Sequence, residues 1–205
     1  MMNTANKLTI FRMILIPIIL LIPFLGLTNS IVGISTTWII IDLIFILACL
    51  TDKLDGYIAR SRNQITTFGK FLDPIADKIL VLTAMLLLVE DARLPAWIPV
   101  LVLFREFLVS GYRLIAVEKQ GDIIAASIWG KVKTVSQMIA LILALIEPNG
   151  FAACLTGTLS GFAFWYNVMV TLFMLISVIT TVLSGFDYLK KGKDLFREEK
   201  TKEKK

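Results

Sequence analysis

Long apolar blocks alternate along the chain with short clusters of polar residues, glycine and proline. Six of these blocks approach the length of about 20 residues that a helix needs to cross the hydrocarbon core of a bilayer. Each helix of a soluble domain would need a charged face, and most of these blocks lack one. The pattern therefore predicts six transmembrane helices, at residues 8–27, 38–57, 71–89, 95–117, 128–146 and 162–186.

The overall composition also indicates a membrane protein. Of the 205 residues, 57% are hydrophobic and 18% are charged, and the mean hydropathy is +0.78. Soluble domains carry roughly 45–50% apolar and about 25% charged residues. The predicted fold class is all-α, a polytopic integral membrane protein with six transmembrane helices. We expect one domain over residues 1–189 and a charged cytoplasmic tail over residues 190–205.

Basic residues are distributed unevenly among the connecting segments. Segments 28–37 and 147–161 contain no Lys or Arg, whereas segments 52–78 and 113–133 and the tail are rich in them. Cytoplasmic loops carry the excess of Lys and Arg, so both termini and the two basic segments are predicted to be cytoplasmic. We therefore expect a multi-pass protein of the cell membrane. The net charge of +5 follows mostly from this asymmetry and implies no nucleic-acid partner.

Rare and absent residue types limit the possible chemistry. Two cysteines, Cys49 and Cys154, lie in apolar surroundings and cannot form a disulfide framework. The chain contains no histidine, so a general base must be a carboxylate, a lysine or a tyrosine. A metal site would consist mainly of oxygen ligands, which favour magnesium, manganese or calcium over zinc or copper.

Segment 52–78 concentrates four aspartates together with small residues and Arg60 on the same helix faces. The positions concerned are Asp52, Asp55, Gly56, Ala59, Arg60, Gly69, Asp73 and Asp77. The first five recur on one face of a helix, and the last three on one face of the next helix. The polar connection between them is short, so the two helices are predicted to be antiparallel neighbours. Counted from that connection, both aspartate pairs reach similar depths, which brings four carboxylates together beneath the cytoplasmic interface.

Four neighbouring carboxylates would repel one another in a medium of low dielectric constant, and divalent cations would remove the repulsion. Ionisable residues within a membrane are functional candidates for this reason. A structural alternative exists for single residues, because Asp73 before Pro74 could cap a helix. Asp52 and Asp55 could likewise pair with neighbouring Lys or Arg. These alternatives do not explain the whole set, so we predict a divalent-metal site.

The segment is similar to the signature of the CDP-alcohol phosphatidyltransferase family, D-x2-D-G-x2-A-R-x8-G-x3-D-x3-D, at every fixed position. The resemblance implies that an alcohol hydroxyl attacks the phosphatidyl phosphorus of a CDP-lipid and that CMP leaves. It implies two Mg²⁺ or Mn²⁺ ions on the four aspartates, with Asp77 also acting as the general base. It also implies a set of residues that contact the CDP-lipid, namely Asp52, Gly56, Ala59, Arg60 and Gly69, with Arg60 on the diphosphate.

Basic residues outside the signature concern the acceptor alcohol. They are Arg105, Arg113, Lys131 and Lys133. Arg105 and Glu106 fall near the middle of a predicted span, where an unpaired charge costs several kcal/mol. They could therefore simply pair with each other, and the two lysines could be ordinary cytoplasmic anchors. Taken together, cations near an acidic metal site predict an anionic acceptor, and the guanidinium fork suits phosphate.

The stretches REFLVSGYR, GKVKT, NKLTIFR and PIADKILV resemble the bacterial phosphatidylglycerophosphate synthase branch of the family. That resemblance implies CDP-diacylglycerol as donor, sn-glycerol 3-phosphate as acceptor and a homodimer. The chain departs from the branch at Ala5, where a proline is common.

Three other interpretations compete with this one. Other branches of the family use the same signature with serine, inositol phosphate or phosphatidylglycerol as the acceptor. A cation transporter would also place aspartates in a membrane, but transporter sites favour the middle of the bilayer, often beside broken helices or repeats. A purely structural membrane anchor would leave the aspartates unexplained.

Overall fold

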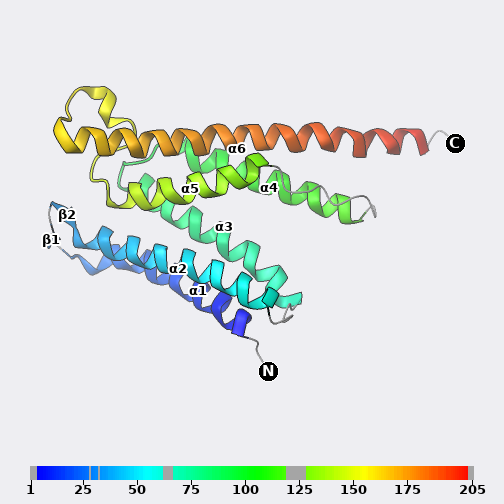
Figure 1. Ribbon diagram of the computed structural model, residues 1–205, viewed down its shortest axis with the longest axis horizontal. Coiled ribbons are helices and arrows are strands. Elements are labelled where there is room, and N and C mark those ends of the chain that lie inside the picture. Colours follow the sequence, from blue (N-terminus) through cyan, green and yellow to red (C-terminus); the bar gives the residue numbers. More distant parts are fainter. Residues whose placement is uncertain (1–3, 28, 32, 62–66, 119–127, 203–205) are drawn as a thin grey trace. The chain divides into compact units, whose positions relative to one another are not determined.

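The computed structural model describes the backbone of residues 4–27, 29–31, 33–61, 67–118 and 128–202. It describes the side chains of the same residues except 4, 5, 53–61, 67, 68, 70, 71, 113, 116–118 and 191–202. The order of the elements along the chain is shown in Figure 1. They are α1 (Thr4–Leu21), η1 (Ile22–Leu25), β1 (Ser30–Ile31), β2 (Ile34–Ser35), α2 (Thr36–Ser61), α3 (Thr67–Glu90), α4 (Trp97–Glu118), α5 (Ile128–Ile146), η2 (Ala153–Thr156) and α6 (Gly161–Lys202).

The helices match the predicted apolar blocks, but several of their ends differ from the prediction. α2 continues to Ser61 rather than ending at residue 57. α1 begins before residue 8 and gives way at Ile22 to a 3-10 turn, which ends at Gly26 with a φ of 59°. α3 begins at Thr67 rather than at residue 71. α6 continues without interruption to Lys202, so the backbone of the predicted tail extends the last helix. A two-stranded antiparallel pairing of β1 with β2 is the small departure from an all-α fold in the described residues.

Pro74 lies inside α3, seven residues after its first residue. A helix cap at Asp73, with Pro74 in the first helical turn, is therefore wrong. Proline has no backbone N–H, so it leaves the carbonyl of the residue four positions earlier without its helical hydrogen bond. The helix continues through this position, and Asp73 lies within it rather than at its end.

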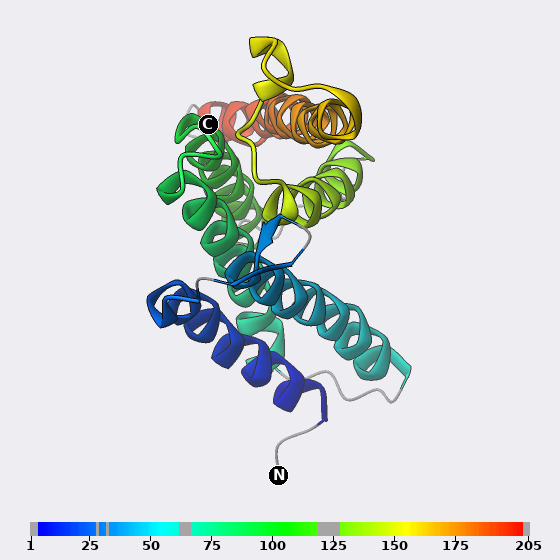
Figure 2. The ribbon, with the colours of Figure 1, turned by 90° about the vertical axis from the view of Figure 1, so that its left-hand side faces the viewer.

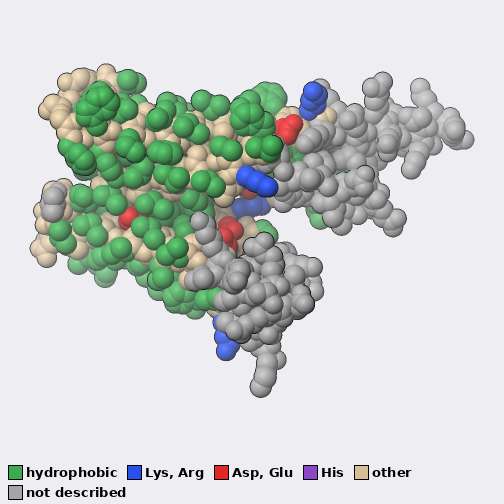
Figure 3. Space-filling view, viewed as in Figure 1, with side chains coloured by type: hydrophobic (Ala, Val, Ile, Leu, Met, Phe, Trp, Pro, Cys, Tyr) green, Lys and Arg blue, Asp and Glu red, His purple; other side chains and the backbone are tan. Residues whose placement is uncertain are grey.

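Length and composition identify helices that could cross a membrane. Three segments are long and apolar enough to cross a membrane, by length and composition: Asn6–Leu25, Ile128–Ile146 and Gly161–Lys190. α2, α3 and α4 contain long apolar stretches as well, but they also carry the charged candidate residues. Apolar side chains cover much of the surface visible in Figure 3, where described charged side chains are few. Such exposure is unusual for a soluble monomer and suits a lipid environment.

The chain forms two compact units. The first contains residues 1–95 and 141–167, and the second contains residues 96–140 and 168–205. In the first unit, α1 packs against both α2 and α3, and α1 and α2 run side by side (Figure 2). The apolar centre of this unit consists of fully buried side chains, among them Ile19, Ile41, Phe45, Leu80, Met85 and Leu88.

Arg93, in the turn after α3, joins three parts of the first unit. Its Nη1 donates to the carbonyl of Glu147 at 2.6 Å and lies 3.4 Å from that of Leu145, at the end of α5. Its guanidinium lies 3.6 Å from the ring centroid of Trp38 on α2, and Nε is 2.7 Å from Asp91 Oδ2. Burial lowers the pKa of the Arg93 guanidinium, while the nearby Asp91 opposes that effect. The side chain thus supplies the carbonyls at the end of α5 with a donor and a positive charge.

We expect Arg93→Gln to destabilise the protein by about 2–3 kcal/mol, because buried carbonyls lose a charged donor and Trp38 loses its cation. This corresponds to a fall of about 4–12 °C in the midpoint of thermal unfolding in detergent. Lys190→Gln, which neutralises an exposed cation on α6, is the control. Equal midpoints for the two variants would show that Arg93 does not hold these elements together.

Candidate active site

The acidic cluster lies in the first unit, on α2 and α3. Asp52 is on α2, and Gly69, Asp73 and Asp77 are on α3. Gly69 is buried, and the three aspartates are half-buried. The backbone of Asp55, Gly56, Ala59 and Arg60 continues α2, but their side chains lie outside the described residues.

A single arginine of α1 joins the aspartates of α2 and α3. Arg12 Nη1 is 2.9 Å from Asp52 Oδ1 and 2.5 Å from Asp77 Oδ1. The Arg12 side chain is fully buried, whereas the side chains of Asp52 and Asp77 are 33% and 39% exposed. One nitrogen therefore brings together carboxylates from the two helices of the signature. Both carboxylates remain open on another side.

A second residue of α1 holds the third aspartate. The Thr9 hydroxyl donates a hydrogen bond of 2.6 Å to Asp73 Oδ1, and Thr9 is itself buried. Thr9 and Arg12 are three positions apart, so they lie on the same face of α1. Asn6, one further step toward the amino end, is also buried. The face of α1 beside the aspartates is thus polar over its first turns, and it becomes apolar toward Ile19.

Thr9 and Arg12 were not among the residues predicted for the site. A signal for them was present, because Asn6, Thr9 and Arg12 recur at intervals of three in an otherwise apolar block. An arginine in such a block needs a carboxylate partner, since an unpaired charge there is costly. The partner itself could not be read from the pattern, because Asp77 is 65 residues away in the chain.

The donor atoms of the cluster suit a hard divalent cation. They are carboxylate oxygens, half-exposed, in a chain without histidine, which is the chemistry that Mg²⁺ and Mn²⁺ select. As they stand, no three acidic side chains in the described residues are close enough together to hold one ion. Arg12 lies between Asp52 and Asp77 and supplies the positive charge that these two carboxylates share.

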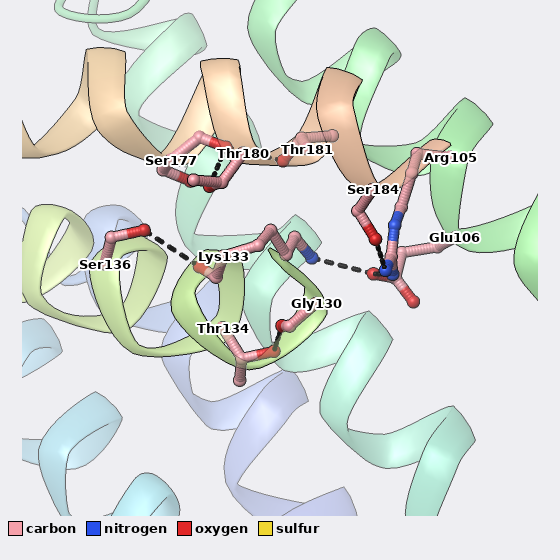
Figure 4. A network of polar contacts seen from close by, with 10 residues as sticks. All are labelled: Arg105, Glu106, Gly130, Lys133, Thr134, Ser136, Ser177, Thr180, Thr181 and Ser184. Carbon is pink, nitrogen blue, oxygen red and sulfur yellow. Dashed lines mark hydrogen bonds and ion pairs between the residues drawn. The ribbon is translucent and has the colours of Figure 1, made fainter. Parts of the chain in front are cut away.

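The basic candidates lie in the second unit, where two of them meet at Glu106 (Figure 4). Glu106 Oε1 accepts from Arg105 Nη1 at 2.9 Å and from Lys133 Nζ at 2.7 Å. The second guanidinium nitrogen of Arg105 is bound to the hydroxyl of Ser184 on α6. The pairing of Arg105 with Glu106, which was the alternative to a role in acceptor binding, is therefore confirmed as a contact. Lys133 binds the same carboxylate.

The other two basic candidates are placed differently. Lys131 is exposed and lies two positions before Lys133, so the two lysines occupy different faces of α5. The Arg113 side chain lies outside the described residues. Gly130 leaves room for Arg105, because an added Cβ there would lie 3.3 Å from the guanidinium. Arg105 and Lys133 are thus the pair of cations that the structure brings together.

The sequence model of the CDP-alcohol phosphatidyltransferase family matches residues 2–183. The chain belongs to the CDP-alcohol phosphatidyltransferase family. It is therefore an integral membrane enzyme. The cluster on α2 and α3 includes positions of the signature given above.

Relatives with assigned activities match almost the whole chain. The CDP-diacylglycerol–glycerol-3-phosphate 3-phosphatidyltransferase of Bacillus subtilis (strain 168) is 39% identical over 199 residues, covering 94% of this chain and 96% of the relative. A probable phosphatidylglycerophosphate synthase of Mycobacterium tuberculosis (strain ATCC 25618 / H37Rv) is 37% identical, covering 91% and 80%. The Haemophilus influenzae CDP-diacylglycerol–glycerol-3-phosphate 3-phosphatidyltransferase is 36% identical, covering 93% and 94%.

We expect Arg12→Met to lower the midpoint of thermal unfolding in a buffer that contains a chelator. The substitution removes the positive charge that Asp52 and Asp77 share. Breaking a fully buried pair costs about 3–5 kcal/mol. These carboxylates are a third exposed, so we expect about 1–3 kcal/mol and a fall of several degrees.

Two controls separate charge from packing. Arg12→Lys retains the positive charge and should lose less stability than Arg12→Met. Lys7→Met alters an exposed cation on the same helix and should have little effect. If Arg12→Lys and Arg12→Met unfold at the same temperature, the charge of Arg12 is not what stabilises the cluster.

Proposed function

We propose that this enzyme transfers the phosphatidyl group of CDP-diacylglycerol to sn-glycerol 3-phosphate, giving phosphatidylglycerophosphate and CMP. The observation that carries the proposal is the complete signature on α2 and α3, of which three aspartates are held by α1. The donor and the acceptor follow from the names of relatives that match nearly the whole chain.

In the proposed mechanism, Asp52, Asp55, Asp73 and Asp77 hold two Mg²⁺ or Mn²⁺ ions. The metals would neutralise the charge of the diphosphate and of the departing CMP. Thr9 fixes the Asp73 carboxylate through its hydroxyl, and Arg12 orients the carboxylates of Asp52 and Asp77. α1 therefore holds three of the four carboxylates, and metal binding would require Arg12 to release at least one of its two aspartates.

Asp77 is the proposed general base. The acceptor hydroxyl oxygen forms a bond to the phosphatidyl phosphorus, its proton passes to the Asp77 carboxylate, and the bond from phosphorus to the CMP oxygen breaks. The Asp77 side chain is 39% exposed, so a substrate hydroxyl can reach it. Gly56, Ala59 and the buried Gly69 are proposed to contact the cytidine nucleotide, and Arg60 its diphosphate.

Arg105 and Lys133 are the proposed centre of the acceptor-phosphate site. Both are nearly buried, with 11% and 6% of their side chains exposed, and they point to the same carboxylate oxygen. A guanidinium and an ammonium that converge on one oxygen offer the charge-assisted hydrogen bonds that a phosphate accepts. Arg113 and Lys131 remain further predicted contacts of the acceptor.

The proposed topology has six spans, with both termini and the signature at the cytoplasmic side of the cell membrane. The distribution of basic residues supports it, as do the exposed apolar side chains on every long helix. A homodimer and a separate tail beyond residue 189 belong to the same proposal. α6 passes continuously through that boundary, so the tail is proposed as an extension of the helix.

The function is tested by release of CMP from CDP-diacylglycerol by the purified enzyme with Mg²⁺ or Mn²⁺. Parallel reactions receive glycerol 3-phosphate, serine, inositol 1-phosphate, phosphatidylglycerol or no acceptor. We expect release that depends on glycerol 3-phosphate and on the metal. Asp77→Asn should lower the rate by at least about 100-fold, because it removes the proposed base.

Glu90→Gln, at the other end of α3, is the matched control and should retain full activity. Release with another acceptor would preserve the mechanism and contradict the assigned acceptor. An absence of metal-dependent release with every acceptor would contradict the proposed reaction.

The two lysines of α5 test the acceptor site directly. Lys133→Gln should raise the KM for glycerol 3-phosphate by about 10–100-fold, the effect of one lost hydrogen bond to a charged group. The KM for CDP-diacylglycerol should change little. Lys131→Gln changes the same residue type on the exposed face and should have a much smaller effect. Equal effects of the two substitutions would contradict a site centred on Arg105 and Lys133.

A further inference from the structure

Glu106 is the common partner of the two cations in the proposed acceptor site. One of its carboxylate oxygens, Oε1, accepts from both Arg105 and Lys133, at 2.9 and 2.7 Å. In Figure 4 the two cations approach this carboxylate from different helices, Arg105 from α4 and Lys133 from α5. The oxygen thus lies where charge-assisted hydrogen bonds from a guanidinium and an ammonium meet.

Charge balance explains why an anion is needed at this position. Arg105 and Lys133 are nearly buried and carry two positive charges, which repel each other and have lost most of their water. The Ser184 hydroxyl, which binds the other guanidinium nitrogen, brings no charge. Glu106 therefore compensates the two cations whenever no other anion is bound there.

A phosphate oxygen would accept hydrogen bonds from the same two donors at the same distances, because charge-assisted N–H···O bonds are about 2.7–2.9 Å long. We propose that Glu106 is a resident anion that competes with the acceptor phosphate for Arg105 and Lys133. The inference rests on the proposed function, which assigns the acceptor phosphate to these two cations. Binding of the phosphate then requires the Glu106 carboxylate to release at least one of them.

The packing indicates which group shifts. Arg105 is confined at Gly130, where an added Cβ would lie 3.3 Å from its Nη2, and it packs at ordinary contact distance against Gly185. Lys133 is the most buried of the three side chains, with 6% exposed, and Glu106 is the most exposed, with 20%. The carboxylate is therefore the group that moves when another anion enters.

This competition makes Glu106 a residue that determines specificity. A monoanion that displaces the Glu106 carboxylate only replaces one negative charge with another, so its net gain in binding free energy is small. A phosphate monoester brings up to two charges and three oxygens, so it can satisfy both cations and displace the carboxylate. The site thus selects doubly charged phosphate monoesters over singly charged anions such as chloride or a carboxylate.

The test is binding of inorganic phosphate to the full-length protein in detergent, followed by thermal unfolding with a chelator present. Phosphate is compared with chloride at equal ionic strength, near pH 8, where phosphate is mostly a dianion. Glu106→Gln should lower the apparent Kd for phosphate by about tenfold, which corresponds to about 1.4 kcal/mol. We expect chloride to raise the unfolding temperature of this variant and to leave that of the unaltered protein unchanged.

A phosphate Kd that is unchanged or higher in Glu106→Gln would overturn the inference, because Glu106 would then not compete for the cations. Glu106→Asp serves where the glutamine variant does not fold, since it keeps the charge but shortens the reach by one methylene. Its phosphate Kd should fall by a few-fold, and a constant or higher value overturns the inference as well. Glu90→Gln is the control for the loss of a carboxylate elsewhere.

The outcome is independent of the acceptor assay. If glycerol 3-phosphate supports no release of CMP, the proposed function fails while the phosphate titration still tests Glu106. If glycerol 3-phosphate is used and Glu106→Gln binds phosphate no more tightly, the proposed function stands and the inference fails.

Discussion

The contact between Arg12 and two aspartates of different helices is the interaction on which the proposed chemistry depends. Without the positive charge at that point, the carboxylates of Asp52 and Asp77 would repel each other. The fully buried guanidinium allows α2 and α3 to bring their acidic faces together. Thr9 adds the third carboxylate from the same face of α1. The first helix is thus the support of the acidic site, although it carries none of the signature residues.

The same physical constraint recurs at the basic cluster with the signs reversed. There, one carboxylate keeps two nearly buried cations together, as one guanidinium keeps two carboxylates together at the acidic site. Charges within an apolar helical protein must be compensated even when no substrate is present. In both clusters the compensating group contacts the atoms that are proposed to bind the ligands. Under the proposed function, ligand binding would therefore be an exchange of partners, and its selectivity would depend on what the ligand offers beyond the resident charge.

Local sequence patterns, namely apolar blocks and helical spacing, predicted the helices and the positions of the aspartates on them. The six apolar blocks became α1–α6, and helical spacing correctly placed Asp52 on one helix and Asp73 and Asp77 on the next. Helix ends were less predictable, since Pro74 suggested a start that the structure places at Thr67. Periodicity says which residues share a face but not which helix that face meets.

Contacts between distant segments account for what was missed. Arg12 and Asp77 are 65 residues apart, and Arg105 and Ser184 are 79 residues apart, so no local pattern connects them. From the sequence, Lys131 and Lys133 were equivalent basic candidates, whereas in the structure Lys131 is exposed and Lys133 is buried. The sequence offered the pairing of Arg105 with Glu106 as one alternative, because adjacent charges near mid-span can compensate each other, whereas the sharing of Glu106 with Lys133 required the fold.

The central claim is that α1, α2 and α3 together build a site for divalent cations in which Arg12 is the resident charge. The most direct measurement is anomalous diffraction at the manganese edge from crystals of the protein grown with and without Mn²⁺. The account predicts manganese bound to the carboxylates of Asp52, Asp73 and Asp77, with Arg12 withdrawn from at least one of its two aspartates. Crystals saturated with Mn²⁺ that show no metal at these carboxylates, and Arg12 still bridging Asp52 and Asp77, would contradict it.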